Sequence, residues 1–291
     1  MPKKSNDAKR KKTPKRVKRY FRDEFFIDSS YFYSVLNNKK IKISIVNYTN
    51  TLPFKWALRR SDLAQNIELQ EDIPSICAQK LKYKQVDLAL VPVALLSELP
   101  TYFIETDFCI GAFKKVDSVK LYSEVPLHQI ESITLDYQSR SSIALTKILC
   151  KYFWKIAPKF VDAIPGFEND TKHKNASVVI GDRTFDLNGK YNYEYDLAEE
   201  WFKFTELPFV FAAWVSIEKI DQELMSEFNK VLKYGVEHCV DAINEHIGNL
   251  GLSKEKALEY LTQRIDYNLN DDKRKAMKVF LEYINKLNAT V

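Results

Sequence analysis

Strand-like and helix-like segments alternate along the chain from Lys40 onward, and this alternation limits the possible fold more than any other feature. Short apolar runs predict strands at 42–46, 67–72, 88–91, 106–110, 116–122, 132–135 and 178–180. Helical spacing of apolar residues predicts helices at 52–60, 74–81 and 143–154, with a helical turn at 93–98. Such alternation with short connections is typical of α/β units, so we expect an α/β fold with mostly parallel sheets.

The last third of the chain predicts helices almost throughout. An apolar run at 208–215 precedes an amphipathic stretch at 218–246. Ser253 and Asn270 are residue types that accept hydrogen bonds from the first N–H groups of a helix. They predict helices at 254–264 and 271–288.

Composition excludes several classes of protein. The 291 residues are enough for one large domain or two lobes. No segment approaches the ~20 apolar residues of a membrane-spanning helix, and no apolar secretory signal is visible. The four cysteines form no C-x-x-C pair, His238 and His246 lack acidic partners at metal spacing, and the seven glycines form no phosphate-binding loop. We therefore expect a cytoplasmic protein without a membrane span, disulfide, metal or other cofactor.

The N-terminal segment is strongly basic. Residues 1–22 contain eleven Lys or Arg and one acid, Asp7, so this segment carries +10. Because the whole chain carries +5, the remaining residues together carry −5. A basic segment can bind nucleic acid or an anionic membrane surface, but blocks of like charge are more often disordered. We expect residues 1–39 to form a disordered extension, and we expect no nucleic acid to bind the rest of the chain.

A polar turn directly after the first predicted strand is a candidate ligand loop. Tyr48, Asn50 and Thr51 follow the strand, and Pro53 restricts the start of the next helix. Asn50 and Thr51 offer short, uncharged hydrogen-bonding groups. Ligands of open α/β sheets bind at the carboxyl ends of the strands, so this turn is a candidate site.

A second polar turn at 136–142 lies between a predicted strand and a predicted helix. It contains Ser139, Arg140, Ser141 and Ser142. Unpaired N–H groups at a helix N-terminus, with Ser hydroxyls beside them, suit an anion such as a carboxylate. Plain helix capping by Ser141 or Ser142 is the alternative explanation.

Three further features have both a ligand-binding and a structural explanation. Ser118 interrupts a predicted strand and faces either a ligand or the protein interior. Asp182 follows the strand at 178–180 and either binds ligand or caps the next segment. Trp201 and Trp214 either line a pocket or belong to the core.

At this point the chain resembles a known family, the chorismate dehydratases of the futalosine route to menaquinone. The segment 47–54, Asn-Tyr-Thr-Asn-Thr-Leu-Pro-Phe, is similar to the family's S-Y-L-N-T-x-P motif. Further similar segments follow in the same order and spacing, at 87–93, 109–112, 139–142, 180–182 and 207–212. The resemblance covers approximately residues 40–287. It departs at Ser141, where the family usually has Thr, at 113–115, where it has a different turn, and at Glu206, where it usually has Gly.

The resemblance implies a type II periplasmic-binding-protein-like fold, in which two α/β lobes joined by two crossover strands close on a ligand in the cleft between them. The crossover strands are expected near 119–125 and 210–215. One lobe then comprises residues 40–123 plus 214–291, and the other comprises residues 124–213. Asn50 and Thr51 belong to the first lobe, and Ser139–Ser142 belong to the second.

The resemblance also implies the reaction, which is loss of water from chorismate to give 3-[(1-carboxyvinyl)oxy]benzoate. Chorismate is then the small-molecule partner, and no cofactor is needed; the sequence sets no oligomeric state. Asn50 is expected to hold the enolpyruvyl or hydroxyl group. The expected substrate-binding residues are Tyr48, Thr51, Ser118, Ser139, Arg140, Ser141 and Ser142.

The proton-abstracting base is left open by the sequence. The matched motifs contain no His or Lys, so a carboxylate of the substrate is one candidate. Asp182, as a second catalytic residue, and Glu199 are the alternatives. Two other functions share the fold: the sister enzyme of the same pathway, 1,4-dihydroxy-6-naphthoate synthase, and a non-catalytic binding protein for small anions.

Overall fold

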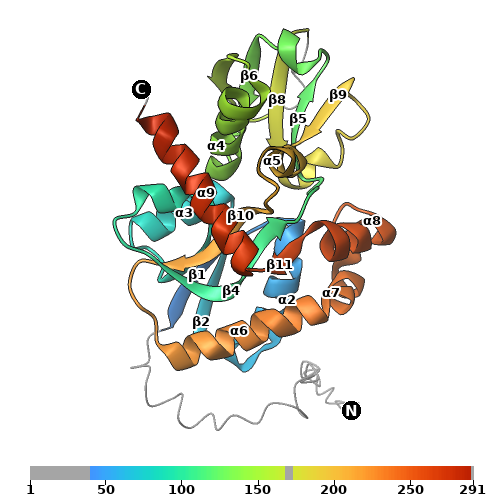
Figure 1. Cartoon of the computed structure of the whole chain (residues 1–291). Helices are drawn as coiled ribbons and strands as arrows, with labels where there is room; N and C mark the ends of the chain where they lie inside the picture. Colours follow the sequence, from blue (N-terminus) through green and yellow to red (C-terminus); the bar gives the residue numbers. More distant parts are fainter. Residues whose placement is uncertain (1–39, 168–172, 290–291) are drawn as a thin grey trace, which may run out of the picture. The chain divides into compact units, whose positions relative to one another are not determined.

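The computed structural model describes residues 40–167 and 173–289, so the predicted disordered extension, residues 1–39, lies outside the described residues. The first of two sheets has six strands in the order β11-β4-β10-β3-β1-β2 (Figure 1). Its strands are β1 (Ile41–Val46), β2 (Ile67–Asp72), β3 (Leu88–Pro92), β4 (Phe103–Ala112), β10 (Phe209–Ser216) and β11 (Asp266–Asn268).

The second sheet has five strands in the order β7-β6-β8-β5-β9. They are β5 (Val119–Ser123), β6 (Ser132–Leu135), β7 (Lys159–Asp162), β8 (Asn175–Ile180) and β9 (Tyr193–Asp196). The prediction of mostly parallel sheets is wrong in part. Strand β1 pairs in parallel with β2 and β3, and β6 with β7 and β8, but β10 and β5 run antiparallel to both of their neighbours. Each sheet is mixed because it receives a strand that comes directly from the other sheet.

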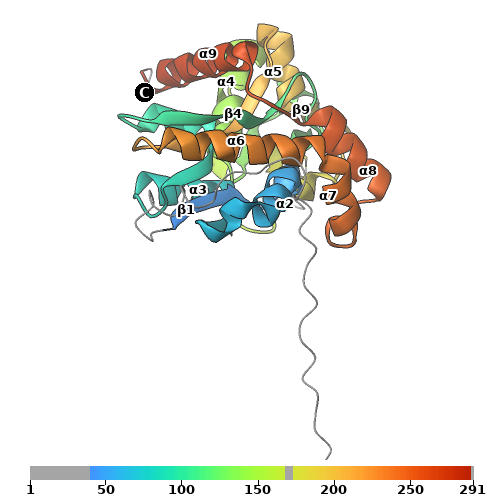
Figure 2. The ribbon, with the colours of Figure 1, turned by 90° about the horizontal axis from the view of Figure 1, so that it is seen from below.

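Helices cover the sheets, and the predicted helical last third is confirmed. They are α2 (Leu52–Arg60), α3 (Pro74–Lys82), α4 (Arg140–Ile148), α5 (Leu197–Thr205), α6 (Gln222–Glu237), α7 (Cys239–His246), α8 (Lys254–Glu259) and α9 (Asp271–Asn288). Helix α6 packs against α2 (Figure 2). Gly235 allows this close approach, because a Cβ there would lie 2.3 Å from the main-chain oxygen of Pro53. Helix α9 contacts both β10 and α4.

Helix ends differ from the sequence prediction in an informative way. Helix α4 begins at Arg140 instead of 143, because the Ser139 side chain caps it by accepting from the N–H of Ser142. The predicted helices at 143–154 and 254–264 each end in a π-helical turn, Leu149–Trp154 and Tyr260–Arg264. Ser253 and Asn270 cap α8 and α9 as expected.

The chain changes sheets twice. It passes from the first sheet to the second between β4 and β5, and it returns through α5 between β9 and β10. Strand β5 pairs only with β8 and β9, so the first change of sheet comes before Val119, ahead of the lobe boundary expected after residue 123. The division into lobes at 40–123 plus 214–291 and 124–213 stays a prediction.

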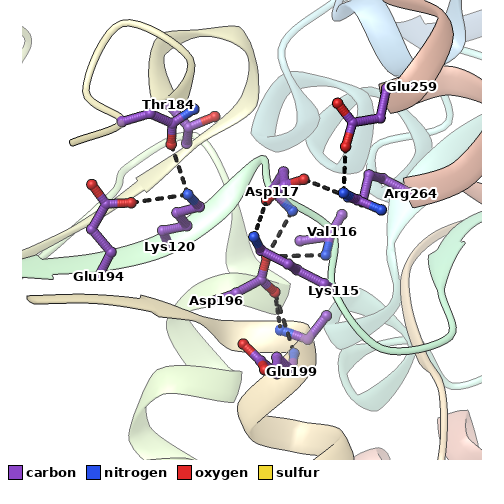
Figure 3. Close-up of polar contacts among 12 residues, drawn as sticks. Lys115, Val116, Asp117, Lys120, Thr184, Glu194, Asp196, Glu199, Glu259 and Arg264 are labelled. Atoms are coloured by element: carbon purple, nitrogen blue, oxygen red, sulfur yellow. Dashed lines mark hydrogen bonds and ion pairs between the residues drawn. The ribbon is translucent and has the colours of Figure 1, made fainter. Parts of the chain in front are cut away.

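Side chains of the second sheet tie the two connections together (Figure 3). The buried carboxylate of Asp196, at the end of β9, accepts hydrogen bonds from the N–H groups of Val116 and Asp117 at 3.0 and 2.7 Å. Burial raises the pKa of Asp196 to about 6. Burial also acts to raise the pKa of Asp117, but hydrogen bonds from Lys115 and Arg264 outweigh it and lower that pKa. Asp196 therefore lies at the start of the connection from β9 to β10, and it fixes the main chain of the connection from β4 to β5.

Two departures from the family pattern lie on these connections. Glu206 ends α5 with φ of +59°, a left-handed conformation that glycine adopts at less cost. Lys114 lies over the ring of Phe202 at 5.0 Å, and Lys115 pairs with Asp117 at 2.9 Å. These residues support the connections, and none of them lines the cavity described below. Separately, none of the described helices is long and apolar enough to span a membrane.

Candidate active site

A small cavity of about 50 Å³ lies between the two sheets and takes side chains from both. The first sheet and its turns contribute Val46, Tyr48, Asn50, Pro74, Pro92, Ile110, Phe211 and Ala212. The second sheet and the connection before it contribute Val116, Ser118, Val119, Ser139, Ser142, Ile180 and Gly181. Two polar turns expected to lie at a common cleft therefore meet here.

The first turn is held from within by Thr51, which leaves Asn50 for the cavity. The Thr51 hydroxyl lies 2.6 Å from the main-chain oxygen of Val46 and 2.9 Å from that of Tyr48, closing the short helix Thr49–Thr51. The hydroxyl of Tyr267 donates to the main-chain oxygen of Asn50 at 3.0 Å. Oδ1 of Asn50 is buried, and no described residue provides it with a hydrogen-bond partner. Because a buried acceptor without a partner is costly, this atom is suited to a ligand that donates a hydrogen bond.

The second turn presents serine hydroxyls. Ser139 Oγ accepts from the N–H of Ser142 at 3.3 Å and from the Ser142 hydroxyl at 3.1 Å. Both side chains are buried and line the cavity. The α4 N-terminus lies beside them, and its first N–H groups have no partners within the helix. This side of the cavity therefore supplies donors, in contrast to the acceptor of Asn50.

Ser118 reaches the cavity from the connection between the sheets. Its main-chain oxygen accepts from the N–H of Gly181 at 2.8 Å, and its hydroxyl receives a hydrogen bond from Tyr260 at 2.7 Å. The sequence analysis missed Tyr260, because it lies in the helical last third, 142 residues from Ser118. Its position in the π-helical turn is a signal that sequence spacing alone does not provide.

Contacts across the cavity involve Tyr48 and Asp182. The Tyr48 hydroxyl donates to the side chain of Gln138 in the second turn. Gly181 has φ of +69°, and a Cβ there would lie 2.8 Å from the Tyr48 ring. The Asp182 carboxylate accepts from the N–H of Thr49 at 3.1 and 3.2 Å. Burial raises the pKa of Asp182 above its ordinary value, and the hydrogen bonds from Thr49 offset only part of this increase. Asp182 thus joins the first turn to the end of β8.

Three residues expected to bind substrate lie elsewhere. Thr51 is fully buried beneath the first turn. Arg140 faces an outer groove and pairs with Glu98 at 2.6 Å. Ser141 donates to the main-chain oxygen of Phe211 at 3.0 Å and accepts from the N–H of Ala94 at 3.1 Å, so it joins the sheets. In each case the hydrogen-bonding group is directed to another part of the protein instead of the cavity.

Several other candidates are structural. Trp201 and Trp214 are fully buried in the core, where Trp201 packs edge-to-face on Phe209 at 5.5 Å. A fully buried carboxylate that the sequence left without a role, Asp136, stabilises the second turn. It accepts from the N–H groups of Ile180 and Gln138 at 3.1 and 3.0 Å.

The cavity is lined by uncharged groups. The described lining residues include no His, Lys, Arg, Asp or Glu. Tyr48 is the one titratable phenol there, and burial raises its pKa. Among the described residues, no three His, Cys, Asp or Glu side chains gather as metal ligands. The arrangement can orient a polar ligand and exclude water, but its lining offers no protein carboxylate or imidazole to abstract a proton.

Comparison with known proteins identifies relatives over almost the whole described region. A family model described as menaquinone biosynthesis matches residues 41–286. The chain is 24% identical over 250 residues to the chorismate dehydratase of Campylobacter jejuni, covering 84% of this chain and 97% of that protein. It is 23% identical over 260 residues to the chorismate dehydratase of Thermus thermophilus, covering 82% of this chain and 93% of that protein.

Solved structures support the fold. A protein of Archaeoglobus fulgidus superimposes with a TM-score of 0.68 and 14% identity, covering 88% of this chain and 100% of that chain. A Candida albicans protein with the generic periplasmic binding protein fold superimposes with a TM-score of 0.59 and 12% identity, covering 87% and 90% of the two chains. At these identities the similarity shows the fold alone. The predicted periplasmic-binding-protein-like fold with two α/β lobes is confirmed.

Proposed function

The chain belongs to the menaquinone biosynthesis family, and from this premise we propose that it is a chorismate dehydratase, a carbon–oxygen lyase. Both named relatives are chorismate dehydratases, and this chain covers more than nine-tenths of each. The proposed reaction converts chorismate into 3-[(1-carboxyvinyl)oxy]benzoate and water. The ring C–H bond and the neighbouring C–OH bond break, and the released electron pair completes the aromatic ring.

The uncharged lining of the cavity is the observation that best supports this reaction. A dehydration that forms an aromatic ring has a large driving force in the substrate itself, so the protein needs mainly to orient the reacting groups and exclude water. Chorismate carries two carboxylates, and one of them can take the proton. A site without its own base, such as the described lining here, suits this mechanism.

In this mechanism Asn50 and the serines have different roles. The amide of Asn50 holds the ring hydroxyl group, because its Oδ1 is an acceptor that lacks a partner among the described residues, and the ring hydroxyl is the group of chorismate that donates. Ser118 and Ser139 bind carboxylate through their hydroxyl groups, aided by the N-terminus of α4, and Ser142 donates its own hydroxyl proton to Ser139. Tyr48 forms a wall between the two turns. Asp182 holds the first turn against the end of β8 through Thr49.

Substrate entry requires the two sheets to separate. A cavity of about 50 Å³ holds only one or two water molecules, which is far less than a molecule of the size of chorismate occupies. The connections 113–118 and 206–208 join the sheets and are the expected hinges. We therefore propose that the described arrangement corresponds to a closed state, and that chorismate enters an opened one.

The test is incubation of the full chain with chorismate, with the product followed by chromatography. We expect conversion to 3-[(1-carboxyvinyl)oxy]benzoate without added metal or cofactor. Chorismate binding without conversion would support the non-catalytic binding protein instead. If chorismate neither binds nor reacts, the proposal is wrong, and the sister naphthoate-forming reaction becomes the next candidate.

The base is tested separately with Asp182→Asn and a pH profile of kcat/KM. If a substrate carboxylate takes the proton, the acid limb of the profile belongs to the substrate and persists in the variant. Loss of the acid limb in Asp182→Asn would identify Asp182 as the base. Glu199→Gln tests the other candidate base in the same way; Glu199 is half-exposed at the start of α5 and does not line the cavity, so the acid limb is expected to persist in this variant.

A further inference from the structure

Tyr260 lies directly behind the cavity and contacts one of its lining serines. It begins the π-helical turn Tyr260–Arg264, and its side chain is buried. Its ring packs edge-to-face on Phe185 with centroids 4.9 Å apart, which fixes the direction of the phenol. Its hydroxyl donates to Ser118 Oγ at 2.7 Å. Tyr260 itself does not line the cavity.

The hydrogen-bonding capacity of Ser118 determines what this contact does. A serine hydroxyl has one proton to donate and two lone pairs to accept with. Tyr260 fills one lone pair from the protein side. None of the described residues accepts the Ser118 proton, and the side chain lines the cavity, so that proton is directed at the ligand.

We propose that Tyr260 is a positioning residue that makes the Ser118 hydroxyl a donor to a carboxylate of the substrate. This inference rests on the proposed function, because it concerns how the same site binds its dianionic substrate. Without the phenol, Ser118 is free to rotate and to turn its proton toward the protein. The contribution of Tyr260 is thus to the direction of a donor, and the phenol itself does not touch the substrate.

Burial supports the role of Tyr260 as a permanent donor. Burial strongly raises its pKa, and the smaller opposing effects come from hydrogen bonding to Ser118 and Asn50. The phenol therefore keeps its proton more firmly than an exposed tyrosine does. Because Asn50 is a neighbour of the same phenol, Tyr260 lies at the junction of the acceptor side and the donor side of the cavity.

The π-helical turn also fixes the main chain beside Ser118. Arg264, at the end of the turn, pairs with Asp117 at 2.6 Å and with Glu259 (Figure 3). Asp117 has φ of +65°, a strained conformation for a residue with a Cβ. One short turn therefore holds Asp117 through Arg264 and Ser118 through Tyr260. Contacts to two consecutive residues, Asp117 and Ser118, fix both the main chain and the side chain, and this restricts the direction of the Ser118 hydroxyl.

The second turn has the same arrangement with different residues. There Ser139 Oγ accepts from the N–H and the hydroxyl of Ser142, so its own proton is also left for the cavity. Donors that come from Ser118 and from Ser139 suit the oxygens of a carboxylate better than those of a neutral ligand. Because the same arrangement occurs in two unrelated segments, it supports the binding of a carboxylate at this cavity, independently of the role of Tyr260.

A double-mutant cycle of Tyr260→Phe and Ser118→Ala on chorismate turnover tests the proposal. We expect each single variant to raise KM by about tenfold and to leave kcat within about twofold, because a carboxylate contact is made in both the ground state and the transition state. The double variant is expected to be no worse than Ser118→Ala, because Tyr260 acts only through Ser118. Additive effects, or a loss in kcat with unchanged KM, would contradict the proposal.

Tyr122→Phe is the matched control. The Tyr122 hydroxyl is also buried and donates to a main-chain oxygen, that of Thr184, at 3.1 Å, but Thr184, unlike Ser118, does not line the cavity. It is expected to lower the melting temperature about as much as Tyr260→Phe, with KM unchanged. A rise in KM equal to that of Tyr260→Phe would show that loss of any buried hydroxyl is enough and would overturn the specific role.

Two further measurements keep the outcomes distinct. Wild-type turnover is measured first: an inactive wild type refutes the proposed function, whereas an additive cycle in an active wild type refutes only the role of Tyr260. If Tyr260→Phe does not fold, site-specific 3-fluorotyrosine at position 260 replaces it. This residue keeps the ring and is a stronger donor, so KM at or below the wild-type value is expected, and a raised KM would overturn the proposal.

Discussion

The two polar turns at the cavity have the same local form but opposite hydrogen-bonding character. Each follows a strand, β1 or β6, and leads into a helix, α2 or α4. In the first turn Thr51 satisfies the main-chain oxygens, and Asn50 is left with an unpartnered acceptor. In the second turn Ser139 is filled as an acceptor and is left with a donor. The comparison shows that the residue that stabilises a turn internally decides what the turn offers to a ligand.

The largest effect is expected from removing the acceptor of the first turn. Asn50→Ala is expected to lower kcat/KM about a hundredfold, similar to the loss of one group that contacts the reacting atoms in other enzymes. Asn47→Ala is the control from the same turn, because Asn47 is exposed and accepts only from Lys55. Near-wild-type turnover by Asn50→Ala would mean that the first turn does not hold the reacting group.

The contact between the first turn and the end of β8 comes next. Gly181→Ala places a Cβ against the Tyr48 ring, whereas Gly189→Ala, with a similar φ of +76°, meets nothing within 4 Å. Both variants carry backbone strain of about 1–2 kcal/mol. Gly181→Ala is expected to lose about 1–3 kcal/mol more in free energy of unfolding because of overpacking, measured by denaturant titration. Equal losses would show that Tyr48 of the first turn is not in tight contact with the end of β8 in solution.

The donor side is tested by Ser139→Ala compared with Ser253→Ala. Both serines cap helices, α4 and α8, so each variant is expected to lose about 1 kcal/mol in free energy of unfolding. Only Ser139→Ala is expected to lower kcat/KM further, by about tenfold, because it also removes a donor to the substrate. If both variants lose stability but retain activity, capping is the whole role of Ser139.

The smallest effect concerns the return connection between the sheets. Glu206→Gly is expected to raise the free energy of unfolding by about 1 kcal/mol, because the residue has φ of +59° and glycine adopts this conformation without a Cβ clash. Glu206→Ala keeps the Cβ and is expected to bring no such gain. Activity is expected to stay unchanged in both variants, since Glu206 does not line the cavity. A loss of turnover in Glu206→Gly would indicate that a stiff connection helps to keep the two turns in register.

Much of the fold could be predicted from the sequence, because the signals are local. The strands β1, β2 and β3 follow runs of apolar residues, and the caps at Ser253 and Asn270 are properties of single side chains. The short strands β7, β9 and β11 were missed, because they contain charged or polar residues and are mostly not buried, so they lack the apolar pattern that identified the equally short β6. The antiparallel placement of β10 was missed for another reason: its partners are set by the return of the chain from the second sheet.

The candidate site was predicted in outline but not in detail. Asn50, Tyr48, Ser118, Ser139 and Ser142 all line the cavity. Ser141 and Arg140 stand between cavity residues in the sequence, yet a helix directs consecutive side chains to different sides, and these two reach Phe211 and Glu98 instead. Sequence proximity identified the right turn, but it did not identify which of its side chains face the ligand.

The sequence by itself determined the α/β alternation, the two polar turns and the family, because apolar periodicity, capping preferences and the order of motifs are written in consecutive residues. The tertiary structure decided which polar groups remain for a ligand. A hydroxyl or amide group is available to a ligand only if no other group of the protein already forms its hydrogen bonds. The partners come from distant positions in the sequence, as Tyr260 does for Ser118 and Asp182 for Thr49. Which polar groups have hydrogen-bond partners is therefore a property of the folded chain. For this reason two turns of similar form provide an acceptor side and a donor side of the same cavity.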